Sequence, residues 1–230
     1  LAESVEPEFI RDNRNRGMVS HSDGELYQAF DLCYDYDIYG DFLSYVQGKA
    51  ELTDYVRALE RQESIYPADY AKLRFLENHD RPRMAHLFPE RRIRLNWLCW
   101  MFFQKGTALL YSGQEWENDH RPDLFDPDPI PMEGPAPLEG LIRRLTALKK
   151  DPILSHGVYS LQACTNDTLL AVWKEGERRL TGAFCLRGAP SLVPVELSDG
   201  RYENLLKPGT FLRVESGLLS LDGNPAVLQS

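Results

Sequence analysis

The spacing of apolar residues changes near residue 152, and this change constrains the fold more than any other feature of the sequence. Before it, short apolar runs alternate with longer stretches of helical periodicity. After it, the period is two, and turn pairs such as Glu175-Gly176, Asp199-Gly200 and Asp222-Gly223 separate the runs. The first pattern is typical of βα units and the second of antiparallel strands. We therefore predict two domains, residues 1–152 and 153–230, without a flexible linker.

The first domain is predicted to alternate strands and helices. Apolar side chains spaced along one face predict an amphipathic helix at 51–63, and the nearly all-apolar segment 90–104 predicts a helix buried on several sides. The Pro- and Asp-rich segment 118–137 has too little apolar content to form an element. The other expected elements are strands at 29–36, 73–76 and 108–111, a helix at 138–150, and second-domain strands at 169–173, 180–186, 191–197, 210–214 and 218–221.

Charge and composition exclude several classes of protein. Against 35 acidic residues stand 26 Lys and Arg, and no basic run interleaves with aromatic residues, so we expect no nucleic-acid partner. The uncharged stretches 95–104 and 106–114 are too short to span a bilayer, so we expect no membrane partner. The cysteines lack CxxC spacing and lie in apolar segments, which predicts reduced thiols instead of a zinc site or disulfides. They are Cys33, Cys99, Cys164 and Cys185.

Three polar clusters stand where predicted strands end: Ala2-Glu3-Ser4, Asn78-His79-Asp80 and Gly113-Gln114-Glu115. Each cluster taken alone has a structural explanation: the first is a solvated terminus, the second is a turn or a helix N-cap, and the third is a loop. Together they matter, because the carboxyl ends of parallel strands meet on one face of a βα sheet. Two carboxylates delivered there by different strands are what acid/base or glycosyl-transfer chemistry requires. We predict that Glu3, His79 and Asp80 lie on one rim.

Two of these segments resemble the α-amylase family of glycoside hydrolases. Residues 75–83, Phe-Leu-Glu-Asn-His-Asp-Arg-Pro-Arg, resemble the Asn-His-Asp motif that ends the family's seventh barrel strand. Residues 106–115, Gly-Thr-Ala-Leu-Leu-Tyr-Ser-Gly-Gln-Glu, look like its eighth-strand segment, with Thr-Ala where a Pro is common. Leu1-Ala2-Glu3 fits its fifth strand, and residues 129–132 resemble the loop before its last helix. The resemblance implies an α/β fold: the C-terminal half of a (β/α) TIM barrel followed by a small antiparallel β-sandwich domain.

The resemblance also implies roles for individual residues. Glu3 would be the general acid/base that protonates the glycosidic oxygen. Asp80 would grip sugar hydroxyls and stabilise the transition state. His79 would bind the same sugar ring, and Arg83 would support it as a further substrate-binding residue.

A retaining mechanism needs a nucleophilic carboxylate as well. The family carries it on the fourth strand, in a Gly-Phe-Arg-x-Asp-like segment that does not occur in these 230 residues. The resemblance thus implies that strands one to four, the inserted small domain and the usual calcium ligands lie outside the chain. We expect no metal site and no cofactor within it, and any calcium would belong to the full-length protein.

Four barrel strands without their neighbours would leave two open sheet edges. We therefore expect the chain to be folded only beside a complementary partner, either the N-terminal half of the barrel or a second copy of itself. The expected substrate is an α-glucan, starch or a maltooligosaccharide. Without the nucleophile, the chain alone is expected to be inactive.

Two other functions fit the sequence. A non-catalytic amylase-like scaffold would need no nucleophile, but it has no physical need for two uncompensated carboxylates at a strand mouth. A carbohydrate-binding module would stack aromatic side chains such as Tyr34, Tyr36 and Trp116 on sugar faces. The residues encoded upstream of Leu1 would separate enzyme from scaffold, because an Arg-x-Asp segment there would supply the nucleophile.

Overall fold

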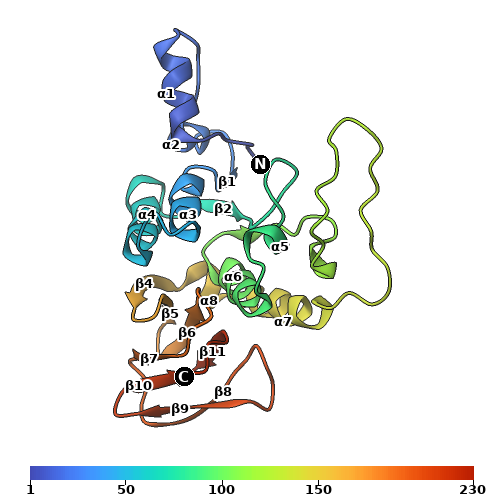
Figure 1. Cartoon of the computed structure of the whole chain (residues 1–230). Helices are drawn as coiled ribbons and strands as arrows, with labels where there is room; N and C mark the ends of the chain where they lie inside the picture. The colour runs from blue at the N-terminus through green and yellow to red at the C-terminus, as the bar shows by residue number, and fades with distance from the viewer. The chain divides into compact units, whose positions relative to one another are not determined.

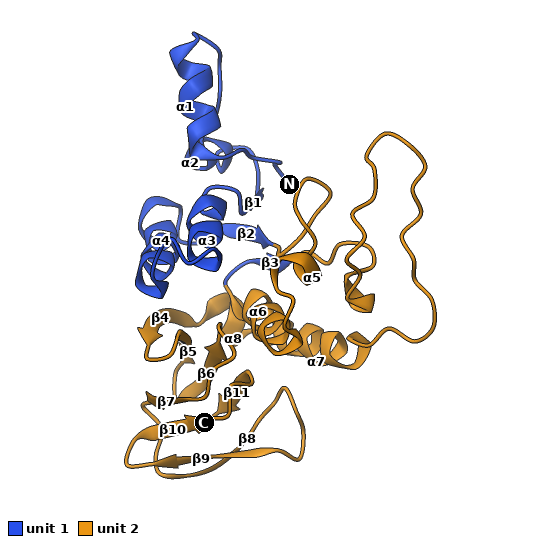
Figure 2. Ribbon diagram, in the orientation of Figure 1, with its two compact units in different colours: residues 1–74, 105–108 blue, residues 75–104, 109–230 orange.

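The computed structural model describes residues 1–230, and the chain divides into two compact units (Figures 1 and 2). Unit 1 comprises residues 1–74 and 105–108, and unit 2 comprises residues 75–104 and 109–230. The chain leaves unit 1 once and returns to it for one short segment. The predicted domain boundary between residues 152 and 153 divides the chain differently and stays a prediction.

Unit 1 is built on a parallel sheet in the order β1 (Leu32–Tyr34), β2 (Ala71–Arg74) and β3 (Thr107–Ala108). Ala2 forms a parallel bridge to Cys33 of β1. The four segments thus pair in chain order, as successive strands of a βα sheet do, and the sheet is open. The predicted α/β class is confirmed. The helices of unit 1 are α1 (Pro7–Asn15), α2 (Asp23–Leu26), α3 (Tyr39–Val46) and α4 (Leu52–Ile65).

Helix α4 confirms the helix predicted at 51–63. Its start is capped by Asp54, whose Oδ2 accepts a hydrogen bond from the Glu51 backbone N–H at 3.1 Å. Tyr55 on its buried face stacks on Tyr45 of α3, with ring centroids 6.1 Å apart. The apolar stripe that the sequence spacing predicts is therefore the face that packs on α3.

The predicted strand at 73–76 is wrong by two residues, because β2 carries Lys72 and Arg74 as buried residues. An apolar run cannot locate a strand whose inward side chains are charged. The predicted strands at 29–36 and 108–111 are longer than β1 and β3, and residues 27–29 form a turn after α2.

Lys72 is wholly buried and lies between two carboxylates. Its Nζ donates to Asp23 of α2 and, at 2.8 Å, to Asp37 Oδ1. Asp37 also accepts a hydrogen bond from the Tyr66 hydroxyl at 2.8 Å. Burial favours a higher pKa for Asp37, but the Lys72 charge and these hydrogen bonds outweigh it and hold the pKa below its usual range. Asp37 and Lys72 therefore form an ion pair inside unit 1.

Arg74 extends this buried ionic cluster along β2. Its Nη1 donates to Asp35 Oδ2 and to Gln62 Oε1, both at 2.8 Å. The Gln62 amide nitrogen in turn donates to Asp35 at 2.9 Å and to Asp37 at 3.0 Å. Gln62 of α4 therefore joins the two ion pairs, and α4, β2 and the segment that follows β1 are connected by polar contacts as well as by apolar packing.

Gly106 is required by a close backbone approach within unit 1. Its φ is +103°, and a Cβ there would collide with the backbone oxygen of Lys72 and lie 2.8 Å from the Lys72 backbone nitrogen. We expect Gly106→Ala to lower the free energy of unfolding by about 3 kcal/mol, through strain and steric overlap. Gly48→Ala is the matched control, since Gly48 has φ +71° and open space around it. Equal losses in urea unfolding would show that the overlap contributes nothing.

Unit 2 contains the helices and loops that follow β2 and β3. The helix predicted at 90–104 is confirmed as α6, that at 138–150 as α7, and the segment 118–137 contains no regular element. The helices are α5 (Met84–Leu87), α6 (Arg91–Phe103), the 3₁₀ turn η1 (Gln114–Trp116), α7 (Glu139–Lys149) and α8 (Ile153–His156).

The last part of unit 2 is the predicted antiparallel β-sandwich. One sheet has the order β7-β10-β9-β8 and the other β11-β6-β5-β4, and a single apolar core with side chains from both sheets lies between them. Strands β4, β8 and β11 were not predicted from the sequence. The strands are β4 (Val158–Cys164), β5 (Thr168–Glu175), β6 (Arg178–Cys185), β7 (Ser191–Pro194), β8 (Gly200–Glu203), β9 (Phe211–Glu215), β10 (Leu218–Leu221) and β11 (Ala226–Gln229).

Helix α6 packs directly on this sandwich within unit 2. The rings of Trp100 and Phe103 each lie 5.5 Å from the ring of Phe184 in β6. Asn96 is the polar exception on this buried helix, because its Oδ1 accepts the Cys185 backbone N–H at 2.7 Å and its Nδ2 donates to Gly223 O at 3.0 Å. The contact between α6 and the β-sandwich is therefore mainly apolar, with Asn96 as a buried polar anchor.

The four cysteines are free, and three of them, Cys33, Cys99 and Cys185, are buried. None of the helices combines the length and the apolar character that crossing a membrane requires.

Candidate active site

The Asn78-His79-Asp80 segment of unit 2 is a turn shaped by its first residue. Asn78 is buried, and its Oδ1 accepts the Asp80 backbone N–H at 2.9 Å. His79 and Asp80 point away from this buried turn, with 41% and 45% of their side chains exposed, and His79 Nε2 lies 3.5 Å from Asp80 Oδ2. The turn therefore presents an imidazole and a carboxylate side by side to solvent.

A buried ion pair holds both ends of this turn. Glu77 before it and Arg83 after it are each 1% exposed, and Arg83 Nη1 lies 2.7 Å from Glu77 Oε1. Glu77 Oε2 accepts the backbone N–H of Met84, the first residue of α5, at 2.5 Å. Burial raises the pKa of the Glu77 carboxyl, while the hydrogen bonds from Met84 and Arg83 oppose that rise. This pair fixes where Asp80 is presented.

Arg83 also ties the turn to the segment that resembles an eighth strand. Its Nη1 donates to Ser112 O at 2.9 Å and its Nε to His120 O at 2.6 Å. Its guanidinium lies 4.5 Å from the centre of the Tyr111 ring. These contacts use Arg83 inside the protein, and the substrate-binding role expected for it stays a prediction.

The third polar cluster, Gly113-Gln114-Glu115, has a structural role. Gly113 has φ +88°, and a Cβ there would lie 2.6 Å from the Ile130 side chain. Gln114 is buried, and its Oε1 accepts the Tyr111 backbone N–H at 3.2 Å. The loop explanation therefore suffices for this cluster.

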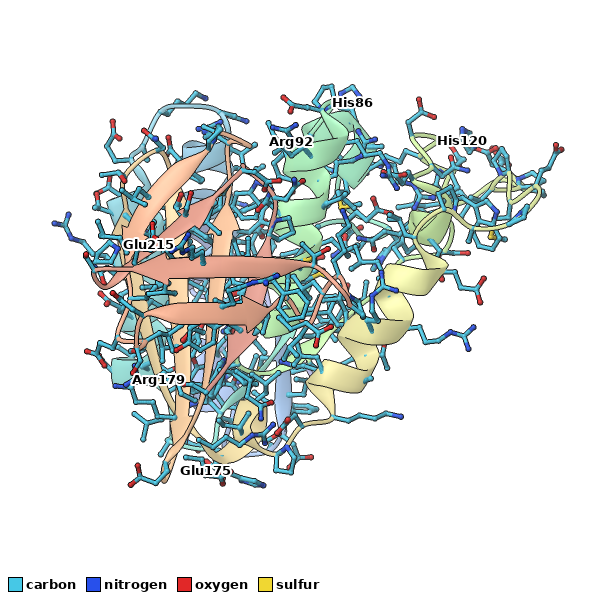
Figure 3. All side chains as sticks on the ribbon, turned by 90° about the horizontal axis from the view of Figure 1, so that it is seen from below. His86, Arg92, His120, Glu175, Arg179 and Glu215 are labelled. Atoms are coloured by element: carbon cyan, nitrogen blue, oxygen red, sulfur yellow. The ribbon has the colours of Figure 1, made fainter.

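The long loop after η1 is fixed by its own side chains. His120 Nε2 lies 2.8 Å from Asp128 Oδ1, and Asp128 Oδ2 accepts the Asp123 backbone N–H at 2.9 Å; Figure 3 shows His120 in this loop. The hydrogen bonds from Asp123 and His120 lower the pKa of Asp128. Arg121 joins the loop to the catalytic candidate, because its Nη2 donates to Asp80 O at 3.2 Å.

Glu3 belongs to unit 1. It follows Ala2, whose N–H donates to Leu32 O at 2.7 Å and whose O accepts the Tyr34 N–H at 3.1 Å. Glu3 thus stands, exposed, directly after a segment that pairs in parallel with β1, as the resemblance to a fifth strand implies. Since Glu3 lies in unit 1 and His79, Asp80 and Arg83 lie in unit 2, their meeting on one rim stays a prediction.

Of the aromatic residues considered for sugar stacking, Tyr36 is buried and the hypothesis is wrong for it. Its ring stacks on Tyr34 with centroids 5.4 Å apart. The Trp116 indole N–H donates to Gly134 O at 3.1 Å.

Sequence analysis missed Glu77 as the anchor of the site. The signal that could have found it is a Glu and an Arg six residues apart on either side of the polar turn.

The known proteins to which this chain is similar are amylases. Residues 160–228 match the family model of the bacterial alpha amylase C-terminal domain. An alpha-amylase from Lactobacillus plantarum is 38% identical over 100% of the chain, with a TM-score of 0.95, and the chain covers 55% of it. A noncanonic maltogenic alpha-amylase from Thermotoga neapolitana is 25% identical over 96% of the chain, with a TM-score of 0.79, and the chain covers 57% of it. No curated protein matches.

The similarity to the first of these structures extends over the whole chain, including the Asn-His-Asp turn and the β-sandwich. The chain spans a little more than half the length of the two amylases. It therefore belongs to the α-amylase family and corresponds to the C-terminal portion of its members.

Proposed function

We propose that the chain is the part of a retaining glycoside hydrolase or transglycosidase that supplies the acid/base Glu3 and the transition-state-stabilising Asp80. Its substrates would be the α-glucosidic bonds of starch or maltooligosaccharides. The observation that carries the proposal is the exposed His79–Asp80 pair on a turn anchored by the buried Glu77–Arg83 ion pair. The 38% identity with an alpha-amylase over the whole chain supports it.

The proposed chemistry uses each side chain for one task. A neutral Glu3 would give its proton to the glycosidic oxygen as the bond breaks, and as a carboxylate it would then take a proton from the incoming water or sugar hydroxyl. Asp80 would accept hydrogen bonds from sugar hydroxyls that strengthen as the ring gains oxocarbenium character. His79 would donate to the same ring. The nucleophile would come from residues outside the chain, on a fourth strand.

Retention of configuration at the anomeric carbon is the expected outcome in the protein encoded by the complete reading frame, hereafter the complete protein. A mechanism with a covalent intermediate inverts the anomeric carbon twice, so the first product from a maltooligosaccharide should be the α-anomer. NMR recorded before the product mutarotates measures this. Residues 1–230 expressed alone serve as the control and should release no reducing sugar, since the nucleophile is missing. A β-anomer as first product, or turnover by residues 1–230 that Glu3→Gln abolishes, contradicts the proposal.

The scaffold alternative predicts a different result. A non-catalytic subunit would give no reducing sugar from the complete protein with starch or maltooligosaccharides, although it could still bind them. The same incubation therefore separates the two functions.

A further inference from the structure

Unit 2 contains a cavity of about 460 Å³ that the proposed active site does not use. Helices α6 and α7 form one wall of the cavity, and the segments 204–212 and 222–225 of the β-sandwich form the other. Ligand pockets in proteins have volumes of roughly 300–1,000 Å³, so this cavity is large enough for a small organic molecule.

The charged residues of the cavity are mainly positive. Arg144 uses its Nε to donate to Leu206 O at 2.9 Å and has terminal nitrogens left for a ligand, and Lys207 makes no ion pair in the structure. Arg91 lies at the rim with one contact to Glu117. The acidic residue of the lining, Asp222, already accepts hydrogen bonds from the backbone and side-chain nitrogens of Asn224 at 3.1 and 2.9 Å. In a protein of net charge −9, this cavity is a local positive site.

The rest of the lining contains no aromatic ring, and its apolar part is aliphatic; Asn204, Thr210 and Asn224 add polar side chains. The aliphatic part includes Leu95 of α6, Leu138 and Leu141 beside and in α7, and Leu206 and Leu212 of the sandwich. Sugar-binding surfaces rely on aromatic faces, which this cavity lacks, so it does not suit a glucan. Aliphatic walls with unpaired cations suit a molecule that has an alkyl body and one negative end.

We propose that this cavity binds a medium-chain monocarboxylate, with the carboxylate at Arg144 and Lys207 and the alkyl chain against the leucines. Arg144 is a binding residue in this proposal because a guanidinium forms paired hydrogen bonds with a carboxylate. The site is separate from the proposed glucan chemistry and does not depend on it.

The test is calorimetric titration of the complete protein with octanoate. Arg144→Gln should weaken octanoate binding by about tenfold or more, through loss of a charge-assisted pair. Gly140→Phe should abolish it. Gly140 lines the cavity, and a Cβ there meets only Arg144 Nη1, at 3.7 Å, so the position accepts a side chain whose ring would occupy space at the cavity wall. Unchanged unfolding midpoints would show that both variants fold.

Arg143→Gln is the matched control, because Arg143 is 78% exposed, pairs with Glu139 at 2.6 Å and does not line the cavity. It should leave octanoate affinity within about twofold, the difference expected for a screened surface charge. Octanol should bind at least about tenfold more weakly than octanoate, and acetate should not bind. Equal binding of octanol, binding of acetate, equal effects of the two Arg variants, or no octanoate binding would each overturn the proposal.

Discussion

Asp80→Asn in the complete protein is expected to lower kcat for maltooligosaccharide hydrolysis by about 100- to 1,000-fold, and Glu3→Gln by about 100- to 10,000-fold. The two losses have different causes. Asn at position 80 keeps the shape of the side chain but removes the negative charge that would stabilise the oxocarbenium-like transition state. Gln at position 3 cannot give a proton to the leaving oxygen.

The leaving group separates these two causes. An α-maltosyl fluoride leaves with little help from an acid, so the Glu3→Gln loss should shrink strongly with this substrate, whereas the Asp80→Asn loss should persist. Asp69→Asn and Glu8→Gln, at exposed acidic positions of unit 1, are the matched controls and should keep full activity. Equal losses for Glu3→Gln on the fluoride and the natural substrate would rule out the acid/base role.

Breaking the buried Glu77–Arg83 pair should have the largest effect on stability. Arg83→Met leaves the Glu77 carboxyl buried without its counter-charge, and such a change costs about 3–5 kcal/mol in the free energy of unfolding. Arg91→Met removes one partner of an ion pair whose arginine is half exposed, and it should cost at most about 1 kcal/mol. A loss below that for Arg83→Met would mean that the pair contributes no more than a surface contact.

The loss caused by Arg83→Met should depend on pH. Burial already raises the pKa of Glu77, and removing the Arg83 charge raises it further. A carboxyl with a higher pKa in the folded than in the unfolded state stabilises folding when it is protonated. The extra stability is therefore complete below the unfolded pKa of about 4 and is lost as the pH rises through the folded value. Urea unfolding should show that Arg83→Met loses little free energy of unfolding at about pH 4 and the full amount at neutral pH.

The double variant Glu77→Met/Arg83→Met provides the second test of this pair. Removing both charges leaves no uncompensated ion, so it should recover at least half of the loss and abolish its pH dependence. A double variant as unstable as Arg83→Met at every pH would instead assign the loss to the contacts of Arg83 with Ser112 and His120.

The position of the Asn-His-Asp turn could be predicted from the sequence, since polar residues after an apolar run mark a strand end. The anchor of the turn could not, because Glu77 appears in sequence as one more polar residue of that cluster, and only the fold shows its pairing with Arg83. The β2 bounds failed for a related reason. Lys72 and Arg74 look like surface residues until their partners, 12 to 49 positions away, are known. The prediction for Tyr36 was wrong in the opposite direction: a residue expected on the surface is buried, because aromatic composition does not distinguish a core ring from an exposed one.

The buried ionic cluster of unit 1 has a consequence for how that unit opens. If α2 detached alone, the buried Lys72 would lose Asp23, one of its two carboxylate partners, and if α4 detached alone, the buried Arg74 would lose its hydrogen bond to Gln62; either loss inside a dry site is costly. Stepwise fraying is therefore penalised, and α2, α4 and β2 should exchange their amide hydrogens with one common opening free energy, as a single cooperative foldon. Lys72 and Arg74, the charged residues that made β2 hard to predict from the sequence, thus couple the opening of α2 and α4 to that of β2.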